Sequence, residues 1–176
     1  MQNRFIMTAF GQDRPGIVAD VTKLLYDNGC NLEETTMTLL ADEFTLILLF
    51  ISPQEGVEEV LLRECRRLER DRGISAFLRP LQKRRETKDD APASCVVHVE
   101  GEDQAGIVYK VSQFLTDLNV NIIDLKSVRL PSPESGAAIY RMDISVQVPP
   151  EIPLSRVEAG LTAVAEELHV EITLAK

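Results

Sequence analysis

The hydrophobic positions along the chain predict one order of strands and helices that occurs twice. In the first half, the apolar run at 5–10 is typical of a buried strand, and apolar residues at three- and four-residue steps over 15–28 predict an amphipathic helix. Extended segments at 31–40 and 44–51 follow, and then a helix at 54–72 and a strand at 74–78. This order predicts the ferredoxin-like α+β fold, in which an antiparallel sheet carries two helices on one side.

The second half of the chain predicts the same βαββαβ order. Its return strand alternates strictly, so one face should lie against a core, namely Tyr140, Met142, Ile144, Val146 and Val148. A helix with an apolar stripe over 154–168 and a strand at 170–174 follow. The hairpin before the return strand carries Pro131, Pro133 and Gly136, and we expect its tip to project.

The two halves also share residues in one fixed register. Gly-Gln-Asp-Arg-Pro-Gly-Ile-Val at 11–18 returns as Gly-Glu-Asp-Gln-Ala-Gly-Ile-Val at 101–108, an offset of 90. At that offset, positions 11, 13, 16, 17, 18, 21, 25, 27 and 31 are all identical. One register held over such a span indicates a tandem duplication. We therefore expect one domain at 1–81, a charged linker at 82–93 and a second domain at 94–176.

Composition excludes several classes of function. The 28 acidic and 19 basic residues leave a net charge of −9, and aromatic residues make up 5% of the chain, so we do not expect direct nucleic-acid binding. The sequence has neither a long apolar run nor the pattern of a secretory signal, so we expect a cytoplasmic protein without a membrane span. Cys30, Cys65 and Cys95 lack CxxC spacing, and we expect reduced thiols, with Cys65 in the core.

The repeated loop before the first helix of each half carries the best candidate chemistry. Gly11 and Gly16 lack a Cβ, so the backbone can turn sharply and a ligand can approach closely. Pro15 is expected at the first position of the helix. Unpaired N–H groups at a helix start suit a carboxylate, and the Asp13 carboxylate suits an ammonium group. An α-amino acid offers both of these groups.

Two alternatives to ligand binding stay open for these residues. Asp13 and Asp103 could cap the helices while the glycines only serve the turn. Asn31 and Asn121 could hydrogen-bond the same ligand, or they could be turn residues at the start of a strand.

The motif Gly-x-Asp-x-x-Gly-Ile-Val between a strand and a helix, in a repeated βαββαβ unit, resembles the ACT domain family over about 4–81 and 94–175. The tandem arrangement without an attached enzyme is similar to the glycine cleavage system transcriptional repressor group. The resemblance implies that two units pair side by side into an eight-stranded sheet, with helices on one side, and bind a small effector in the seam.

Two ligand-binding sites follow from this resemblance, each with residues from both units. The first would be lined by Gly11, Asp13, Pro15, Gly16, Ile17 and Val18 together with Asn121. The second would be lined by Gly101, Asp103, Ala105, Gly106, Ile107 and Val108 together with Asn31. Because Gln104-Ala105 replaces Arg14-Pro15, we expect the second loop to be less rigid.

The resemblance therefore predicts a non-catalytic regulator that senses an amino acid of the glycine or serine class and acts on a protein partner. The process it implies is transcriptional control of glycine and one-carbon metabolism. The alternative is a ligand-independent adaptor on the same fold. An enzyme would need paired acid–base groups, and the repeated loop offers one carboxylate per copy.

The two histidines and the strand edges bear on cofactors and partners. His98 and His169 are far apart in sequence and we expect neither to have a carboxylate partner, so we expect no metal or general-base role for them and no cofactor. We expect a homodimer, because strand edges remain after two units pair.

Overall fold

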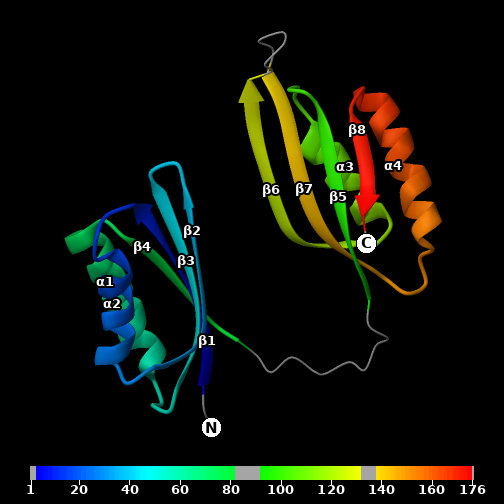
Figure 1. Cartoon of the computed structure of the whole chain (residues 1–176). Helices are drawn as coiled ribbons and strands as arrows, with labels where there is room; N and C mark the ends of the chain where they lie inside the picture. Colours follow the sequence, from blue (N-terminus) through cyan, green and yellow to red (C-terminus); the bar gives the residue numbers. More distant parts are fainter. Residues whose placement is uncertain (1–2, 82–91, 132–137, 176) are drawn as a thin grey trace. The chain divides into compact units, whose positions relative to one another are not determined.

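The computed structural model describes residues 3–81, 92–131 and 138–175, and the chain divides into two compact units at 1–86 and 87–176. Within each unit, two helices cover one face of a four-stranded antiparallel sheet (Figure 1). This arrangement confirms the two ferredoxin-like domains. Most of the expected linker, at 82–91, and the hairpin tip, at 132–137, lie outside the described residues.

The elements of both units follow the predicted order. The first unit contains β1 (Asn3–Gln12), α1 (Ile17–Asp27), β2 (Asn31–Leu40), β3 (Glu43–Ser52), α2 (Val57–Arg72) and β4 (Ser75–Pro80). The second contains β5 (Ala93–Glu102), α3 (Ile107–Asp117), β6 (Asn121–Pro131), β7 (Ala138–Val148), α4 (Leu154–Leu168) and β8 (Glu171–Ala175). The sheet orders are β2-β3-β1-β4 and β6-β7-β5-β8, with β2 and β6 at an edge. Side-by-side pairing of the two sheets stays a prediction.

Each unit has a core of its own, between its sheet and its helices. In the first unit, alternate residues of β1 and β3 pack against α1 and α2, and the Phe5 and Phe50 rings stack with centroids 5.6 Å apart. In the second unit, the predicted face of β7 is confirmed, because its last four members are fully buried and Tyr140 packs against them. All three cysteines are free thiols. Cys65 lies in the core as predicted, and burial raises the pKa of its thiol to about 11.

The duplication is visible in backbone details as well as in sequence. The pairing of β2 with β3 shifts register between Leu32 and Glu34, and the pairing of β6 with β7 shifts between Ile122 and Asp124, 90 residues later. Both shifts mark a β-bulge, which adds one residue to the edge strand and reverses the faces of the residues beyond it. The two edge strands therefore present equivalent positions to equivalent faces.

The first helix of each unit begins later than the sequence predicted. Pro15 is not at the first helical position, because Gly16 follows it with a left-handed φ of +87° and α1 begins at Ile17. Gly106 has a φ of +97° before α3. A residue with a side chain is strained at such φ values, so glycine is required at both positions.

Gly101 is required for a different reason, which gives a test of the packing in the second unit. A Cβ at this position would lie 2.6 Å from Cγ1 of Val170, so we expect Gly101→Ala to lower the free energy of unfolding by about 1–3 kcal/mol. Val170→Ala removes the nearest clashing atom, Cγ1, and leaves Cβ at 2.9 Å, so the double variant should recover part of the loss beyond additivity. Urea unfolding of the four proteins measures this coupling. If the losses in the free energy of unfolding were strictly additive, contact with Val170 would not be the reason for a glycine at position 101.

Candidate functional site

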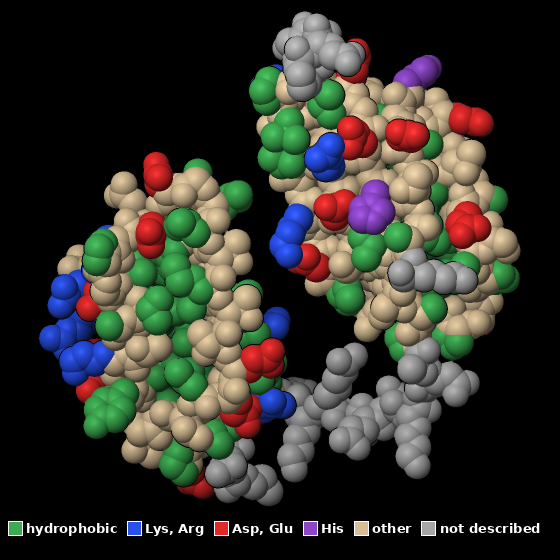
Figure 2. All heavy atoms as spheres, in the orientation of Figure 1, with side chains coloured by type: hydrophobic (Ala, Val, Ile, Leu, Met, Phe, Trp, Pro, Cys, Tyr) green, Lys and Arg blue, Asp and Glu red, His purple; other side chains and the backbone are tan. Residues whose placement is uncertain are grey.

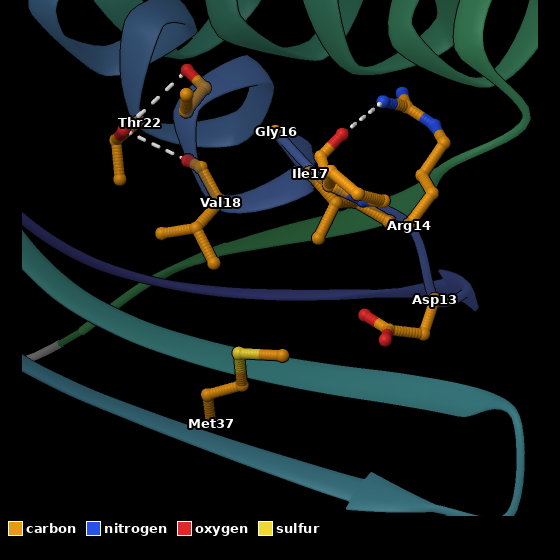
Figure 3. A pocket seen from close by; sticks show the side chains of 9 residues that line it. Asp13, Arg14, Gly16, Ile17, Val18, Thr22 and Met37 are labelled. Carbon is orange, nitrogen blue, oxygen red and sulfur yellow. Dashed lines mark hydrogen bonds between the residues drawn. The ribbon is translucent and has the colours of Figure 1, made fainter.

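The repeated loop of the first unit borders an open hollow between α1 and β2 with a volume of about 730 Å³ (Figure 3). Its lining comprises Asp13, Arg14, Pro15, Gly16, Ile17, Val18, Ala19, Thr22 and Met37. Five of these were predicted from the sequence, namely Asp13, Pro15, Gly16, Ile17 and Val18. The others come from the same loop, from the next turn of α1, and from the edge strand. Val18 and Met37 project toward each other across the hollow.

The start of α1 leaves hydrogen-bond donors free at this hollow. The Ile17 N–H donates to the Arg14 carbonyl at 3.3 Å, and no side chain caps the helix. In the described part of the chain, the N–H groups of Val18 and Ala19 have no acceptor. The alternative that Asp13 caps the helix is therefore wrong. Uncapped N–H groups at the positive end of the helix dipole suit an anion.

The carboxylate of Asp13 lines the same hollow and is exposed. Its backbone N–H donates to the Asp42 carbonyl at 2.8 Å, which fixes the loop against the β2–β3 turn. The neighbouring Arg14 is turned to Asp20 on α1, with Nη2 and Oδ2 2.6 Å apart, and this bond lowers the pKa of the Asp20 carboxyl. Within the described ranges, no ion pair or hydrogen bond involves the Asp13 carboxylate. The described part of the chain thus leaves an unpaired carboxylate and unpaired N–H donors at one hollow.

The second loop differs at the carboxylate. Arg129 on β6 contacts Asp103 with Nε and Oδ2 2.7 Å apart. At the offset of 90, the first unit has Leu39 where the second has Arg129, so Asp13 has no such neighbour. The Asp103 carboxylate does not cap α3, so the capping alternative is wrong here too. The Gln104 side chain donates to the Leu168 carbonyl at the end of α4, which tethers the loop that was expected to be less rigid.

Two of the residues predicted in the first unit, Gly11 and Asn31, lie outside this hollow. Gly11 is in β1, where a Cβ would lie 2.9 Å from the Gly73 carbonyl oxygen, so packing accounts for this glycine as it does for Gly101. Asn31 begins β2 and borders a separate hollow of about 430 Å³ on the far side of Ala19 and Thr22. Asn121 is exposed at the start of β6. Their participation in sites across a seam stays a prediction.

The fold and the repeated corner agree with comparisons to known proteins. The model of the ACT domain matches residues 3–77. The chain belongs to the ACT domain family. The second unit repeats the strand order of the first, so the protein is a tandem of two ACT units.

Relatives of this ACT protein include a transcriptional repressor and a UPF0237 protein. It is 27% identical over 172 residues to the glycine cleavage system transcriptional repressor of Escherichia coli, covering 97% of this chain and 88% of that protein. A UPF0237 protein of Methanopyrus kandleri is 36% identical over 61 residues, 35% of this chain and 68% of that protein. The crystal structure of a protein from Galdieria sulphuraria matches with a TM-score of 0.80 and 27% identity, covering 99% of this chain and 98% of that one.

The edge strand of the first ACT unit exposes apolar side chains beside the hollow. Met37 and Leu39 on β2 are 43% and 54% exposed, on the same face as the helices. Figure 2 shows hydrophobic side chains gathered on the first unit between α1 and β2. An apolar wall next to a polar corner is typical of a small-molecule site.

The expectation that His98 has no carboxylate partner is wrong. The pairing of β5 with β7 places His98 opposite Asp143, with Nδ1 and Oδ1 2.6 Å apart, so His98 does have a carboxylate partner. Strand pairing across 45 residues supplies this partner, and sequence proximity could not reveal it. The described residues contain no group of three His, Cys, Asp or Glu side chains placed to hold a metal ion. None of the described helices is long and apolar enough to cross a membrane.

Proposed function

We propose that this protein is a non-catalytic regulator that binds a small amino acid, of the glycine or serine class, at the corner between β1 and α1. The observation that carries the proposal is the pairing of uncapped N–H groups at α1 with the unpartnered carboxylate of Asp13. The N–H groups would bind the α-carboxylate of the ligand, and Asp13 would bind its α-ammonium group. The hollow between Val18 and Met37 leaves room for a small side chain.

The relative from Escherichia coli supports a regulatory role, because it aligns over nearly the whole chain and is named as a transcriptional repressor of the glycine cleavage system. By analogy, ligand binding would alter contacts with a protein partner in the cytoplasm, and the regulated process would be glycine and one-carbon metabolism. A net charge of −9 argues against direct contact with DNA.

A thermal-shift screen with the twenty amino acids tests this function. A ligand at a hundred times its Kd should stabilise the protein by about 2.7 kcal/mol. Because each unit has a core of its own, the shift falls on the transition of the first unit, and for a domain of that size 2.7 kcal/mol corresponds to a rise in Tm of about 11–22 °C. Glycine and serine should give the largest rise. The absence of any shift, together with capture of a partner protein that is unchanged in Asp13→Asn, would favour the ligand-independent adaptor instead.

A further inference from the structure

The outer face of the first sheet, away from the helices, is open within its unit, and its middle carries apolar residues and threonines without a charge. We call it the apolar face. Its middle carries Phe10, Ile47 and Phe77, which are 42%, 41% and 65% exposed. Phe10 on β1 and Phe77 on β4 stack with ring centroids 5.9 Å apart. Thr8 stands between Phe77 and Ile47 in the strand pairing, so the face combines exposed apolar side chains with uncharged polar ones. Large exposed apolar side chains gathered on one face mark a contact surface.

The second unit carries two charged residues and a threonine at the matching positions of its own outer face. The strand pairings place Glu100 where Phe10 stands, Asp143 where Ile47 stands, and Thr173 where Phe77 stands. Each of the two carboxylates has a partner on the neighbouring strand. Arg141 contacts Glu100 with Nε and Oε2 2.8 Å apart, and His98 contacts Asp143. The fold therefore tolerates a solvated outer face, and the apolar face of the first unit is not a requirement of the fold.

Charged side chains lie only toward the rim of the apolar face, and their order across the sheet is specific. One row of paired residues runs from Glu34 on β2, through Leu49 and Ile6, to Arg79 on β4. An acid thus stands at one edge of the sheet, a base stands at the opposite edge, and only apolar residues lie between them. Neighbouring strands are about 4.8 Å apart, so three strand spacings separate the two charges by roughly 14 Å.

We propose that the outer face of the first sheet is the interface of a homodimer, packed against the same face of a second copy around a two-fold axis parallel to the strands. This axis places β2 over β4 of the partner and β3 over its β1, as in an aligned β-sandwich. Glu34 then faces Arg79 of the partner subunit, and the pair occurs twice. Leu49 faces Ile6 of the partner subunit. The face is self-complementary in both charge and apolarity, which selects a second copy as its occupant.

The mass of the full chain in solution tests the interface, measured by analytical ultracentrifugation over a range of concentrations without ligand. We expect a dimer. The triple variant Phe10→Glu, Ile47→Asp, Phe77→Thr carries the residues of the second unit and should be a monomer with an intact core, as checked by circular dichroism. Thr173→Glu, at the matching place on the second unit, should stay a dimer. A monomeric unaltered protein, a dimeric triple variant or a monomeric Thr173→Glu would each overturn the proposal.

A charge exchange tests the two-fold geometry and does not depend on the triple variant folding. Glu34→Arg and Arg79→Glu each place like charges across the interface, so each should raise the Kd of the dimer about 10-fold. The double variant restores opposite charges and should return the Kd to within about 3-fold of the unaltered protein. Because the two residues lie too far apart to touch within one copy, only contact between copies can give this rescue. Additive weakening in the double variant would overturn the proposed axis and the interface with it.

Discussion

Asp13→Asn should weaken amino-acid binding by about 30- to 1000-fold, which corresponds to about 2–4 kcal/mol for a lost charge-assisted pair. The ligand's ammonium group would lose the one carboxylate in the hollow that no cation of the described chain neutralises. The substitution keeps the size of the side chain and the backbone N–H that binds the Asp42 carbonyl. Isothermal titration with glycine or serine, or whichever amino acid gives the largest thermal shift, measures the change.

The second unit provides the matched control for this prediction. Asp103→Asn should change binding by less than about 3-fold, because Arg129 already occupies that carboxylate. Leu39→Arg introduces at the same place in the first unit the arginine that the second unit carries, and it should weaken binding nearly as much as Asp13→Asn. The reverse change, Arg129→Leu, should expose a second carboxylate. Equal losses in Asp13→Asn and Asp103→Asn would show that the contact with Arg129 does not decide which corner binds.

Phe50→Ala should destabilise the first unit by about 3–5 kcal/mol, a large fraction of the stability of a domain of this size. Phe50 is fully buried on the central strand β3 and stacks on Phe5, so removal of its ring leaves a cavity that the sheet cannot close. The second unit has a separate core and should unfold at an unchanged urea concentration, which gives an internal reference.

Tyr26→Ala is the control for Phe50→Ala. Tyr26 also belongs to the first unit, but its side chain is 81% exposed, and its loss should change the free energy of unfolding by less than about 0.5 kcal/mol. Urea unfolding followed by circular dichroism compares the two variants. A shift of both transitions in Phe50→Ala would mean that the two cores do not unfold independently.

The order of elements could be predicted because the two-residue alternation of strands and the three- and four-residue spacing of helices are both strong in this sequence. The alternation from Tyr140 to Val148 corresponds directly to the buried face of β7. The helix start at Ile17 could not be predicted, because proline and glycine are both common there and only the backbone angle of Gly16 decides between them. The bulges in β2 and β6 left no signal in the pattern, since every residue of these strands near the bulge is at least partly exposed.

The residues of the candidate site that are close together in the sequence were predicted, and those that come from a distant strand were not. The residues from Asp13 to Val18 are local, so a repeated motif was enough to find them. Met37 joins them through the packing of β2 beside α1, and Arg129 reaches Asp103 from a strand more than twenty residues away. Comparison of the two halves position by position would have marked Leu39 and Arg129 as a difference. Only the structure shows that this difference places an arginine against Asp103 in the second unit and a leucine at the same place in the first.

The bulge is at the same position in both units, so the length of the edge strand up to the bulge has stayed constant since the duplication. A residue lost from only one edge strand would slip that strand by one position and turn every later side chain to the wrong face. Between β2 and β3 two residues intervene, whereas between β6 and β7 there are six, so the two copies differ in length at the end of a hairpin. Inside the strands, change has come by exchange of side chains at constant length. The spacing of the strand residues is therefore shared by the two units, whereas their side chains differ. Engineered insertions should be placed at the hairpin ends.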